Sequence, residues 1–139
     1  VDARHRLAIR LPVLGSESYA SSEELEQLRR IATSGRSALI RILLHDPDAA
    51  LRNDHRLIAL AQRLPSSIQI RVPVDEVDLG WASACLLNDV GGYLFLPEAE
   101  RPQGRAARSH RANAAPLQQH FDEVWDRSER ASMLLTLDI

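Results

Sequence analysis

Residues 38–44 form a nearly continuous apolar run, Ala-Leu-Ile-Arg-Ile-Leu-Leu, and this run constrains the fold more than any other feature of the chain. A strand that alternates apolar and polar side chains has one face in water, whereas a continuously apolar strand is covered on both faces. Covered strands of this kind are typical of parallel sheets with helices on both sides. The run therefore predicts a central strand in an α/β domain.

Strand and helix patterns come before this run. Residues 7–14 have the character of a first strand, in which Pro12 removes a backbone donor and suggests a strand end or an edge position. A helix follows, because Ser21 and Glu24 have the spacing of a capping box. Gly35 ends that helix as its C′ residue.

A second helix and a third strand complete the first half. The helical pattern covers residues 57–64, with Asp48, Asn53 or Asp54 as alternative N-caps. Residues 67–72 alternate apolar and polar side chains, which predicts a half-buried strand. Strands that alternate with helices indicate parallel pairing in this half of the sheet.

The second half is predicted to begin with a hairpin, in which residues 81–88 and 92–96 are the strands and a tight, glycine-containing turn joins them. Residues 98–115 are polar and arginine-rich without a steady period, which predicts a long loop. Pro116 then opens a last helix at its N1 position. Residues 133–139 are either a terminal strand or a frayed tail. The order β-α-β-α-β-β-β-α predicts an α/β fold with a mixed β-sheet flanked by helices.

Three less common side chains are predicted to lie in the core. Phe121 and Trp125 are one helical turn apart on the apolar face of the last helix. Cys85, the single cysteine of the chain, lies in an apolar run. An apolar setting raises the pKa of a thiol, so we interpret Cys85 as a small core residue and not as a nucleophile.

The chain contains no lysine, and all 17 basic side chains are arginine. This excludes a Schiff-base lysine, a P-loop lysine and a lysine acting as nucleophile or general base. A formal net charge of −2 argues against a dedicated nucleic-acid binder. No apolar run approaches the ~18 residues of a membrane span, and the charged start lacks a signal-peptide core. We therefore expect a cytoplasmic protein with no membrane partner, and no cofactor is predicted.

The order of elements resembles one half of the phospholipase D superfamily. Residues 37–46 and 57–71 resemble its strand-helix-strand unit, and Phe-Asp-Glu-Val-Trp-Asp-Arg-Ser at residues 121–128 resembles its closing helix. Residues 82–89 occupy the place of the family's His-x-Lys-x-x-x-x-Asp strand. The resemblance implies that this chain has half of a phospholipase D-like fold.

The same alignment predicts a degenerate active site with no catalytic residue. Counted back from Asp89, the family's histidine nucleophile falls at Ala82 and its lysine at Ala84. The family's phosphodiester transfer needs an imidazole to form the covalent phospho-enzyme and a cation to stabilise the developing charge. Two methyl groups supply neither, so that mechanism is lost.

The chain is also similar to bacterial phospholipase D-like domains of unknown function that lie C-terminal to GNAT-type acetyltransferases. The sequences His-Arg-Leu-Ile-Ala-Leu-Ala-Gln-Arg-Leu and Phe-Asp-Glu-Val-Trp carry this likeness. It implies a fused or associated acetyltransferase domain. The chain begins at Val1 and not at methionine, so we expect residues 1–139 to be a single domain from a longer protein. Phospholipase D-like halves tend to pair, which also predicts a homodimer with Trp81 at the contact.

Polar residues cluster after the predicted central strand, at its carboxyl end, where open α/β sheets bind ligands. They are His45, Asp46, Asp48, Arg52, Asp54 and His55. The simplest interpretation is a turn with an aspartate as helix cap and with His55 on the helix surface. The cluster could instead bind an anion through His45, Arg52 and the helix N-terminus, or a metal through His45, Asp46 and His55. We predict the ligand-binding residues His45, Arg52, His55 and Trp81, and no metal site.

We therefore interpret the chain as a non-catalytic phospholipase D-like binding or regulatory module. One alternative is a phosphoester-processing enzyme whose site is rebuilt from His45, Asp46 and His55. The other is a nucleic-acid-binding accessory domain that uses the arginines of residues 98–115, namely Arg101, Arg105, Arg108 and Arg111. That segment has no aromatic residue for base stacking, which favours a solvated loop.

Overall fold

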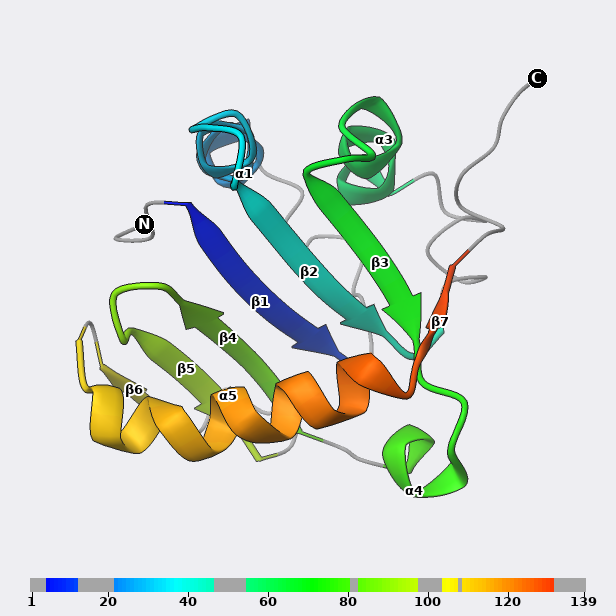
Figure 1. The fold of residues 1–139 in the computed structure, drawn as a ribbon, viewed down its shortest axis with the longest axis vertical. Helices are drawn as coiled ribbons and strands as arrows, with labels where there is room; N and C mark the ends of the chain where they lie inside the picture. The colour runs from blue at the N-terminus through cyan, green and yellow to red at the C-terminus, as the bar shows by residue number, and fades with distance from the viewer. Residues whose placement is uncertain are drawn as a thin grey trace.

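The computed structural model of the chain shows the predicted alternation of strands and helices (Figure 1). It describes residues 5–12, 22–46, 55–80, 83–97, 104–107 and 109–131. The first half contains β1 (Arg6–Leu11), α1 (Ser22–Ala32), β2 (Leu39–Leu44), α3 (Arg56–Arg63) and β3 (Ile68–Val72). The second half contains α4 (Glu76–Leu79), β4 (Ala84–Asn88), β5 (Tyr93–Leu96), β6 (Arg105–Ala107), α5 (Arg111–Asp126) and β7 (Glu129–Arg130).

The described strands form one seven-stranded mixed sheet in the order β6-β5-β4-β1-β2-β3-β7. β1, β2 and β3 are parallel, as the strand-helix alternation predicted. β4 lies antiparallel beside β1 and continues through the predicted hairpin into β5 and then β6. β7 adds two residues antiparallel to β3 at the opposite edge. The α/β fold with a mixed sheet flanked by helices is therefore confirmed.

Helices cover both faces of the sheet (Figure 1): α1 and α3 lie on one face and α5 lies on the other. β2 is buried between these layers, since Ile42 packs in the core under α1 and α3 while Leu43 packs in the core under α5. Both side chains are fully buried, as the apolar run at residues 38–44 predicted. Phe121 and Trp125 are buried in the α5 layer with their ring centroids 5.9 Å apart, so their predicted core role is also confirmed.

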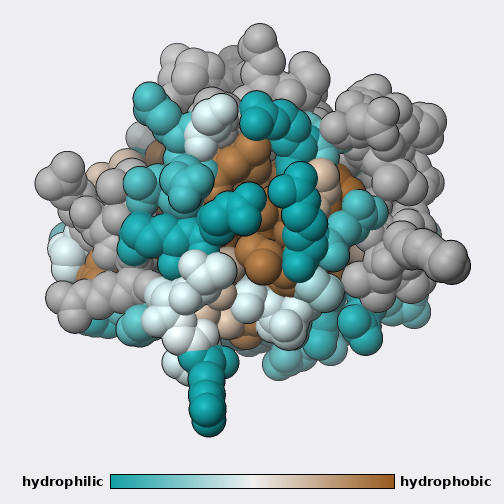
Figure 2. All heavy atoms as spheres, turned by 90° about the horizontal axis from the view of Figure 1, so that it is seen from above, coloured by the Kyte–Doolittle hydropathy of each residue, from teal (hydrophilic) through white to brown (hydrophobic). Residues whose placement is uncertain are grey.

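Apolar side chains lie between hydrophilic rims on the face formed by α1 and α3 (Figure 2). A hollow of about 300 Å³ between these helices is lined by the apolar Leu25, Ala59 and Leu60 and by charged side chains that include Arg29 and Arg56. The two helices therefore leave part of their apolar faces near solvent. No helix in the described ranges is long and apolar enough to cross a membrane.

The prediction of a long loop at residues 98–115 is wrong in two places. Arg105–Ala107 forms β6, which pairs with β5, and α5 begins at Arg111 instead of Pro116. His110 caps this helix, because its Nδ1 accepts a hydrogen bond from the backbone N–H of Asn113 at 3.2 Å. Pro116 lies in the second turn, where it lacks only the donor to the carbonyl of the exposed Ala112.

The helix caps also differ from the prediction. His55 is the N-cap of α3: its Nδ1 accepts from the Leu57 N–H at 3.1 Å. The predicted N-caps Asp48, Asn53 and Asp54 lie outside the described residues, as does Ser21 before α1. Gly35 is not the C′ residue of α1, which ends at Ala32. Glu76–Leu79 forms the short helix α4, capped by the Asp75 side chain, which accepts from the Val77 N–H at 3.0 Å.

Candidate functional site

A row of paired residues crosses the sheet on the face that α5 covers. Arg10 of β1 pairs with Cys85 of β4, and Cys85 pairs with Phe95 of β5. On the other side, Arg10 pairs with Leu43 of β2, which pairs with Arg71 of β3. Directly paired residues project to the same face of a sheet, so these side chains form a continuous line beneath α5. Arg10 is the charged residue at the centre of this line.

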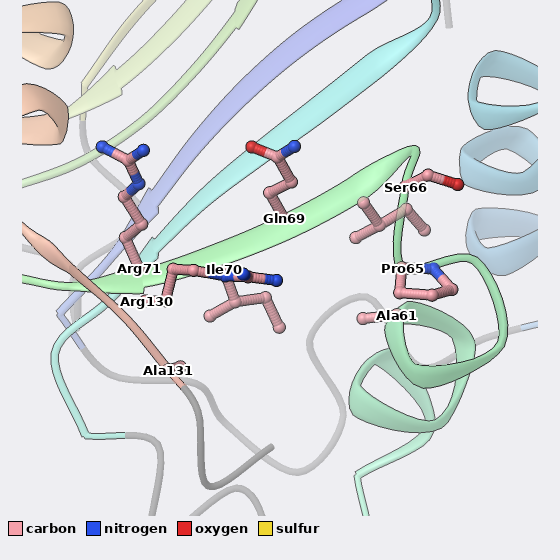
Figure 3. A pocket seen from close by; sticks show the side chains of 9 residues that line it. Ala61, Pro65, Ser66, Gln69, Ile70, Arg71, Arg130 and Ala131 are labelled. Atoms are coloured by element: carbon pink, nitrogen blue, oxygen red, sulfur yellow. The ribbon is translucent and has the colours of Figure 1, made fainter. Parts of the chain in front are cut away.

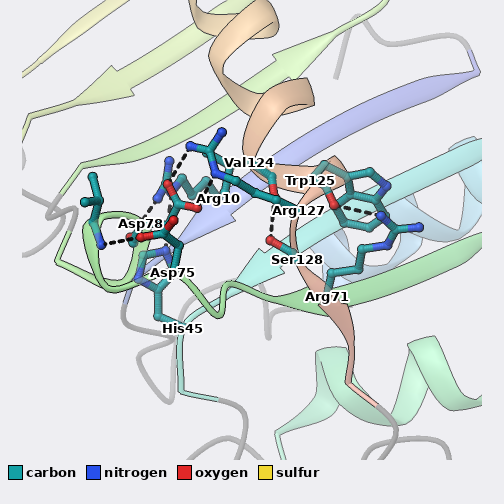
Figure 4. Close-up of polar contacts among 10 residues, drawn as sticks. Arg10, His45, Arg71, Asp75, Asp78, Val124, Trp125, Arg127 and Ser128 are labelled. Atoms are coloured by element: carbon teal, nitrogen blue, oxygen red, sulfur yellow. Dashed lines mark hydrogen bonds and ion pairs between the residues drawn. The ribbon is translucent and has the colours of Figure 1, made fainter.

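Arg10 is almost fully buried, at 2% exposure, close to the carboxyl ends of β1 and β2. Its Nε donates to Nε2 of His45 at 3.3 Å, and its Nη2 donates to the backbone oxygen of Asp78 at 3.0 Å (Figure 4). The carboxyl ends of parallel strands are where open α/β sheets bind ligands. His45, which follows β2 at this end, belongs to the predicted 45–55 cluster, and the group at the centre of the row is Arg10.

His45 lies next to Arg10 as a neutral side chain. Burial, reinforced by the positive charge of Arg10, lowers its pKa from 6.5 to about 4. A backbone hydrogen bond with Leu79 opposes this shift, as does the charge of Asp78. At pH 7 His45 thus acts as a hydrogen-bonding group and not as a cation. Together with Arg10, it contacts the backbone at the end of α4.

Asp78 joins α4 to the end of α5 through Arg127. Arg127 Nε donates to Oδ2 at 2.7 Å and Nη2 donates to Oδ1 at 2.8 Å (Figure 4). The hydrogen bonds from Arg127 hold the pKa of the Asp78 carboxyl below its ordinary value, although burial opposes them. In return, the Asp78 carboxylate raises the pKa of Arg127. The fork-to-fork geometry fixes α4 at the same end of the sheet as Arg10.

A cavity of about 230 Å³ adjoins this cluster, between the sheet and α5. Polar groups line one part of it, and they are Arg10, Ser83, Cys85 and His120. Apolar groups line the rest, and they are Phe95, Pro116, Leu117 and Phe121. A mostly apolar cavity with a few converging polar groups is the usual form of a small-molecule site.

Apart from Arg10, the titratable groups that line the cavity are uncharged at neutral pH. Burial raises the pKa of the Cys85 thiol to about 11, and the charge of Arg10 opposes this only in part. This agrees with the interpretation of Cys85 as an unreactive thiol, although its side chain is partly accessible from the cavity. Burial and the charge of Arg10 lower the pKa of His120, while Asp78 and Glu123 oppose the shift. Arg10 therefore supplies the charge that lines the cavity.

A second hollow, of about 420 Å³, lies along the outer edge of β3 (Figure 3). Pro65, Ile68, Ile70 and Ala131 contribute apolar surface to it, among other lining residues. Arg71 also borders it, but its Nη1 donates to the backbone oxygen of Trp125 at 2.7 Å and its guanidinium lies 4.6 Å from the Trp125 ring centroid. Arg71 is thus occupied in holding the end of α5 on the sheet.

The four predicted ligand-binding residues do not form a described cluster. His45 lies beside Arg10, whereas His55 is buried as the cap of α3 and not on the helix surface. Arg52 and Trp81 lie outside the described residues. The prediction that these four residues bind a ligand therefore stays a prediction. No group of three or more metal-ligating side chains occurs within the described part of the chain.

Sequence reasoning missed Arg10, Asp78 and Arg127. The available signal was Arg10, a charged residue that interrupts the apolar first strand. A charge at such a position is either exposed at a sheet edge or buried with partners, and the sequence does not distinguish these cases. Its partner Asp78 is 68 residues away, so no local pattern could connect them.

The structure also shows where part of the segment aligned with the family's His-x-Lys-x-x-x-x-Asp strand lies. Ala84 is buried at the start of β4, and Ala82 lies outside the described residues. Asp89 follows the opposite end of β4, where its Oδ2 accepts from the backbone N–H of His5 at 2.9 Å. In this structure Asp89 therefore contacts the chain just before β1.

Comparison with known proteins gives a fold and a family. No curated protein sequence matches this chain. Its structure is similar to that of TrmBL2, an archaeal chromatin protein described as showing a novel mode of DNA binding, with a TM-score of 0.61 and 13% sequence identity. The match covers 93% of this chain and 46% of the other, so this chain spans about half the length of that neighbour. Identity this low shows a shared fold alone.

The family is shown by sequence. The family model described as Domain of unknown function (DUF7931) matches residues 1–137. The chain therefore belongs to the DUF7931 family.

Proposed function

We propose that this domain is a non-catalytic, phospholipase D-like binding module. The observation that carries the proposal is Ala84, which stands where the resemblance places the family's lysine and whose side chain is buried at the start of β4. A buried methyl group cannot hold a phosphate oxygen or move a proton. The order of strands and helices and the mixed sheet support the phospholipase D-like assignment.

The neighbouring polar groups support binding over catalysis. His45 and His120 are neutral at pH 7 because burial and Arg10 lower their pKa values, and Cys85 keeps its proton. General acid–base catalysis works best when the pKa of the acting group lies near the working pH. His45, at about 4, and Cys85, at about 11, lie far on either side of neutrality. Asp78 is held as a carboxylate by Arg127. Such a cluster can position a ligand but is poorly suited to exchange protons with it.

The direct test is an assay of the purified domain with bis(4-nitrophenyl) phosphate, with and without divalent cations. We expect no turnover above the buffer rate. Turnover that His45→Ala removes, in a variant shown to be folded by circular dichroism, would overturn the proposal. It would instead establish the alternative of a phosphoester-processing enzyme with a rebuilt site.

The predicted partners belong to the same proposal. A binding module of this kind would act on a fused or associated acetyltransferase domain, and it would pair with a second copy when isolated. Light scattering of the domain and of the full-length protein tests both expectations. A strictly monomeric domain that also shows no association with the acetyltransferase would leave the module without the predicted partners.

A nucleic-acid-binding role is the second candidate, and the fold shared with a chromatin protein is the observation that favours it. Two of the arginines predicted to contact nucleic acid, Arg105 and Arg111, lie within the described residues. The guanidinium of Arg105, a residue of β6, lies 5.1 Å from the centroid of the Phe95 ring. Arg111 is the first residue of α5. Fluorescence anisotropy with duplex DNA at two salt concentrations decides the point. Saturable binding that weakens steeply with salt, as phosphate contacts require, would favour this role.

A further inference from the structure

We propose that the groove between α1 and the β4–β5 part of the sheet binds an amphipathic helix of a partner protein, with arginine or lysine along the edges of that helix. This inference rests on the proposed function, because it names the kind of partner that the binding module takes. The groove has a volume of about 580 Å³ and lies on the face of the sheet opposite to α5. Its apolar lining residues are Leu7, Leu28, Ile31 and Leu86.

A row of paired apolar residues leads out of the core across this face. Ile9 of β1 pairs with Leu86 of β4, which packs against the same core cluster. Leu86 pairs with Leu94 of β5, and Leu94 pairs with Ala106 of β6. Exposure rises along the row, since Ile9 is fully buried, Leu86 is half-buried and Leu94 is 38% exposed. The core therefore continues into an apolar surface that water reaches, and contiguous surfaces of this kind mark interaction sites.

The spacing of the sheet makes a helix the best-fitting occupant. α1 packs on β1 and β2, and α3 packs on β3. Helices that pack side by side are ~8–10 Å apart and neighbouring strands are ~4.8 Å apart, so adjacent helices are offset by about two strands. A helix beside α1, on the side away from α3, would thus lie over β4 and β5, where Leu86 and Leu94 are. α1 has 11 residues and is ~16 Å long, so about three turns of a partner helix match it.

The charges along α1 select a basic partner. Every charged side chain among the described residues that line the groove is a glutamate, and two of these, Glu23 and Glu26, are exposed. Glu23 is in the first turn, where an acidic side chain also stabilises the helix itself, whereas Glu26 lies beyond that turn. The two arginines of α1 are in its last turn. Arg29 lines the hollow between α1 and α3, which Glu26 also borders, and Arg30 donates from Nε to Gln27 Oε1 at 3.0 Å. Arginine or lysine at the edge of a docked helix would therefore meet carboxylates.

Three synthetic peptides test the proposal by fluorescence anisotropy with the folded domain. The first is an amphipathic helix of about 15 residues with leucine on one face and arginine at both edges, since shorter isolated helices are marginally stable. The second carries glutamate in place of arginine. The third keeps the arginines but has two interior prolines, which break the helix. We expect the first peptide to bind at least about tenfold more tightly than either of the others.

A matched pair of variants locates the binding. Leu94→Asn replaces an apolar side chain of the proposed surface with a polar one of similar size. Leu79→Asn makes the same change in α4, at a leucine that is 43% exposed against 38% for Leu94. We expect Leu94→Asn to weaken binding of the arginine peptide by about tenfold, the loss that matches one leucine left out of the interface, and Leu79→Asn to leave it unchanged.

A second pair of variants tests the charges and leaves the sheet intact. Glu23→Gln combined with Glu26→Gln should weaken binding of the arginine peptide by about threefold. Glu123→Gln combined with Glu129→Gln removes two exposed glutamates elsewhere and should have no effect. Circular dichroism checks the folding of each variant. If Leu94→Asn does not fold, this second pair and the shifts of the wild-type amide signals of residues 84–88 and 93–96 on addition of the arginine peptide still locate the site.

Three outcomes of the peptide titrations would overturn the proposal: equal affinity for the arginine and glutamate peptides, wild-type affinity in a folded Leu94→Asn variant, or no saturable binding at hundreds of micromolar. Two other occupants of the same surface would overturn it as well. One is a second copy of the chain, seen in light scattering as a dimer that Leu94→Asn disrupts. The other is a lipid surface, seen as binding to phosphatidylglycerol vesicles that Leu94→Asn abolishes, although the acidic border of the groove opposes an anionic membrane.

None of these results bears on the phosphodiesterase assay, so the assigned partner and the non-catalytic role fail separately. If the domain neither hydrolyses the phosphodiester nor binds the arginine peptide, this kind of partner alone is rejected. If it hydrolyses the phosphodiester, the proposed function fails whatever the peptide does.

Discussion

Arg127 donates two hydrogen bonds to the Asp78 carboxylate, from Nε at 2.7 Å and from Nη2 at 2.8 Å. Asp78 is in α4 and Arg127 directly follows α5. The pair therefore joins two helices through residues that are 49 positions apart in the sequence. The Asp78 side chain is 3% exposed, while that of Arg127 is 46% exposed. The pair is thus a buried carboxylate covered by a partly solvated arginine, and it holds α4 at the carboxyl ends of β1 and β2.

Asp78→Asn should lower the melting temperature by roughly 5 °C, because it removes the charge that both Arg127 nitrogens contact. The folded-state pKa of Asp78 is below the ordinary value of 3.8. Its stabilising contribution is therefore fully present above about that pH and is lost as the pH falls through the lower folded-state pKa. Melting curves between pH 2 and 7 measure both effects. Asp126→Asn, at an exposed position of α5, is the control, and an equal loss in that variant would contradict the prediction.

His45→Gln should make the free energy of unfolding depend less on pH between about 4 and 6.5. The pKa of His45 is about 4 in the folded state against an ordinary 6.5, so the unfolded chain binds more protons between these values. Stability should be fully present above pH 6.5 and fall as the pH drops toward 4. The shift corresponds to ~3 kcal/mol, and partial exposure reduces this to ~1–2 kcal/mol. Urea unfolding at several pH values measures it. His5→Gln, at the opposite end of β1, controls for the loss of one imidazole; a wild-type slope in His45→Gln would refute the assignment.

Cys85 should react slowly with thiol reagents in the folded domain. Burial raises its pKa from 9.0 to about 11, and the thiolate is the reactive form. The alkylation rate should therefore be low at pH 7 and keep rising up to about pH 11, whereas the unfolded chain should level off about two pH units earlier. Rates measured with and without denaturant make the comparison. A folded-state rate that levels off near pH 8 would show that the thiol is activated.

Gly104→Ala should detach β6 from the sheet. A Cβ at this position would clash with the Phe95 backbone oxygen, so the chain would have to move away from β5. We expect a destabilisation of ~1–3 kcal/mol in chemical unfolding. Gly35→Ala is the matched control, because a Cβ there has no neighbour within 4 Å. Equal stability of the two variants would mean that β6 does not approach β5 as closely as the structure shows.

The sequence by itself predicted those strands and helices whose apolar residues recur with the period of a buried strand or of an amphipathic helix. The apolar run at residues 38–44 became β2, and the stripe at residues 57–64 became α3, because a buried strand and an amphipathic helix each record in the sequence which faces meet the core. The hairpin of β4 and β5 was predictable from its glycine turn, in which Gly91 has the left-handed φ of 84°. These signals were enough for the α/β class and the parallel first half.

Tertiary structure alone decided the short elements and the site. β6 and β7 have three and two residues, too few to show a period, and they exist because an edge of the sheet offers them backbone partners. Arg10 occurs in the sequence as an interruption of an apolar strand, and its meaning depends on a carbonyl 68 residues away. A buried charge is stable only where the fold supplies partners, and those partners come from strands and helices that meet only when the chain is folded. The sequence could therefore point to the carboxyl ends of the parallel strands, whereas packing alone brought Arg10, Asp78 and Arg127 together there.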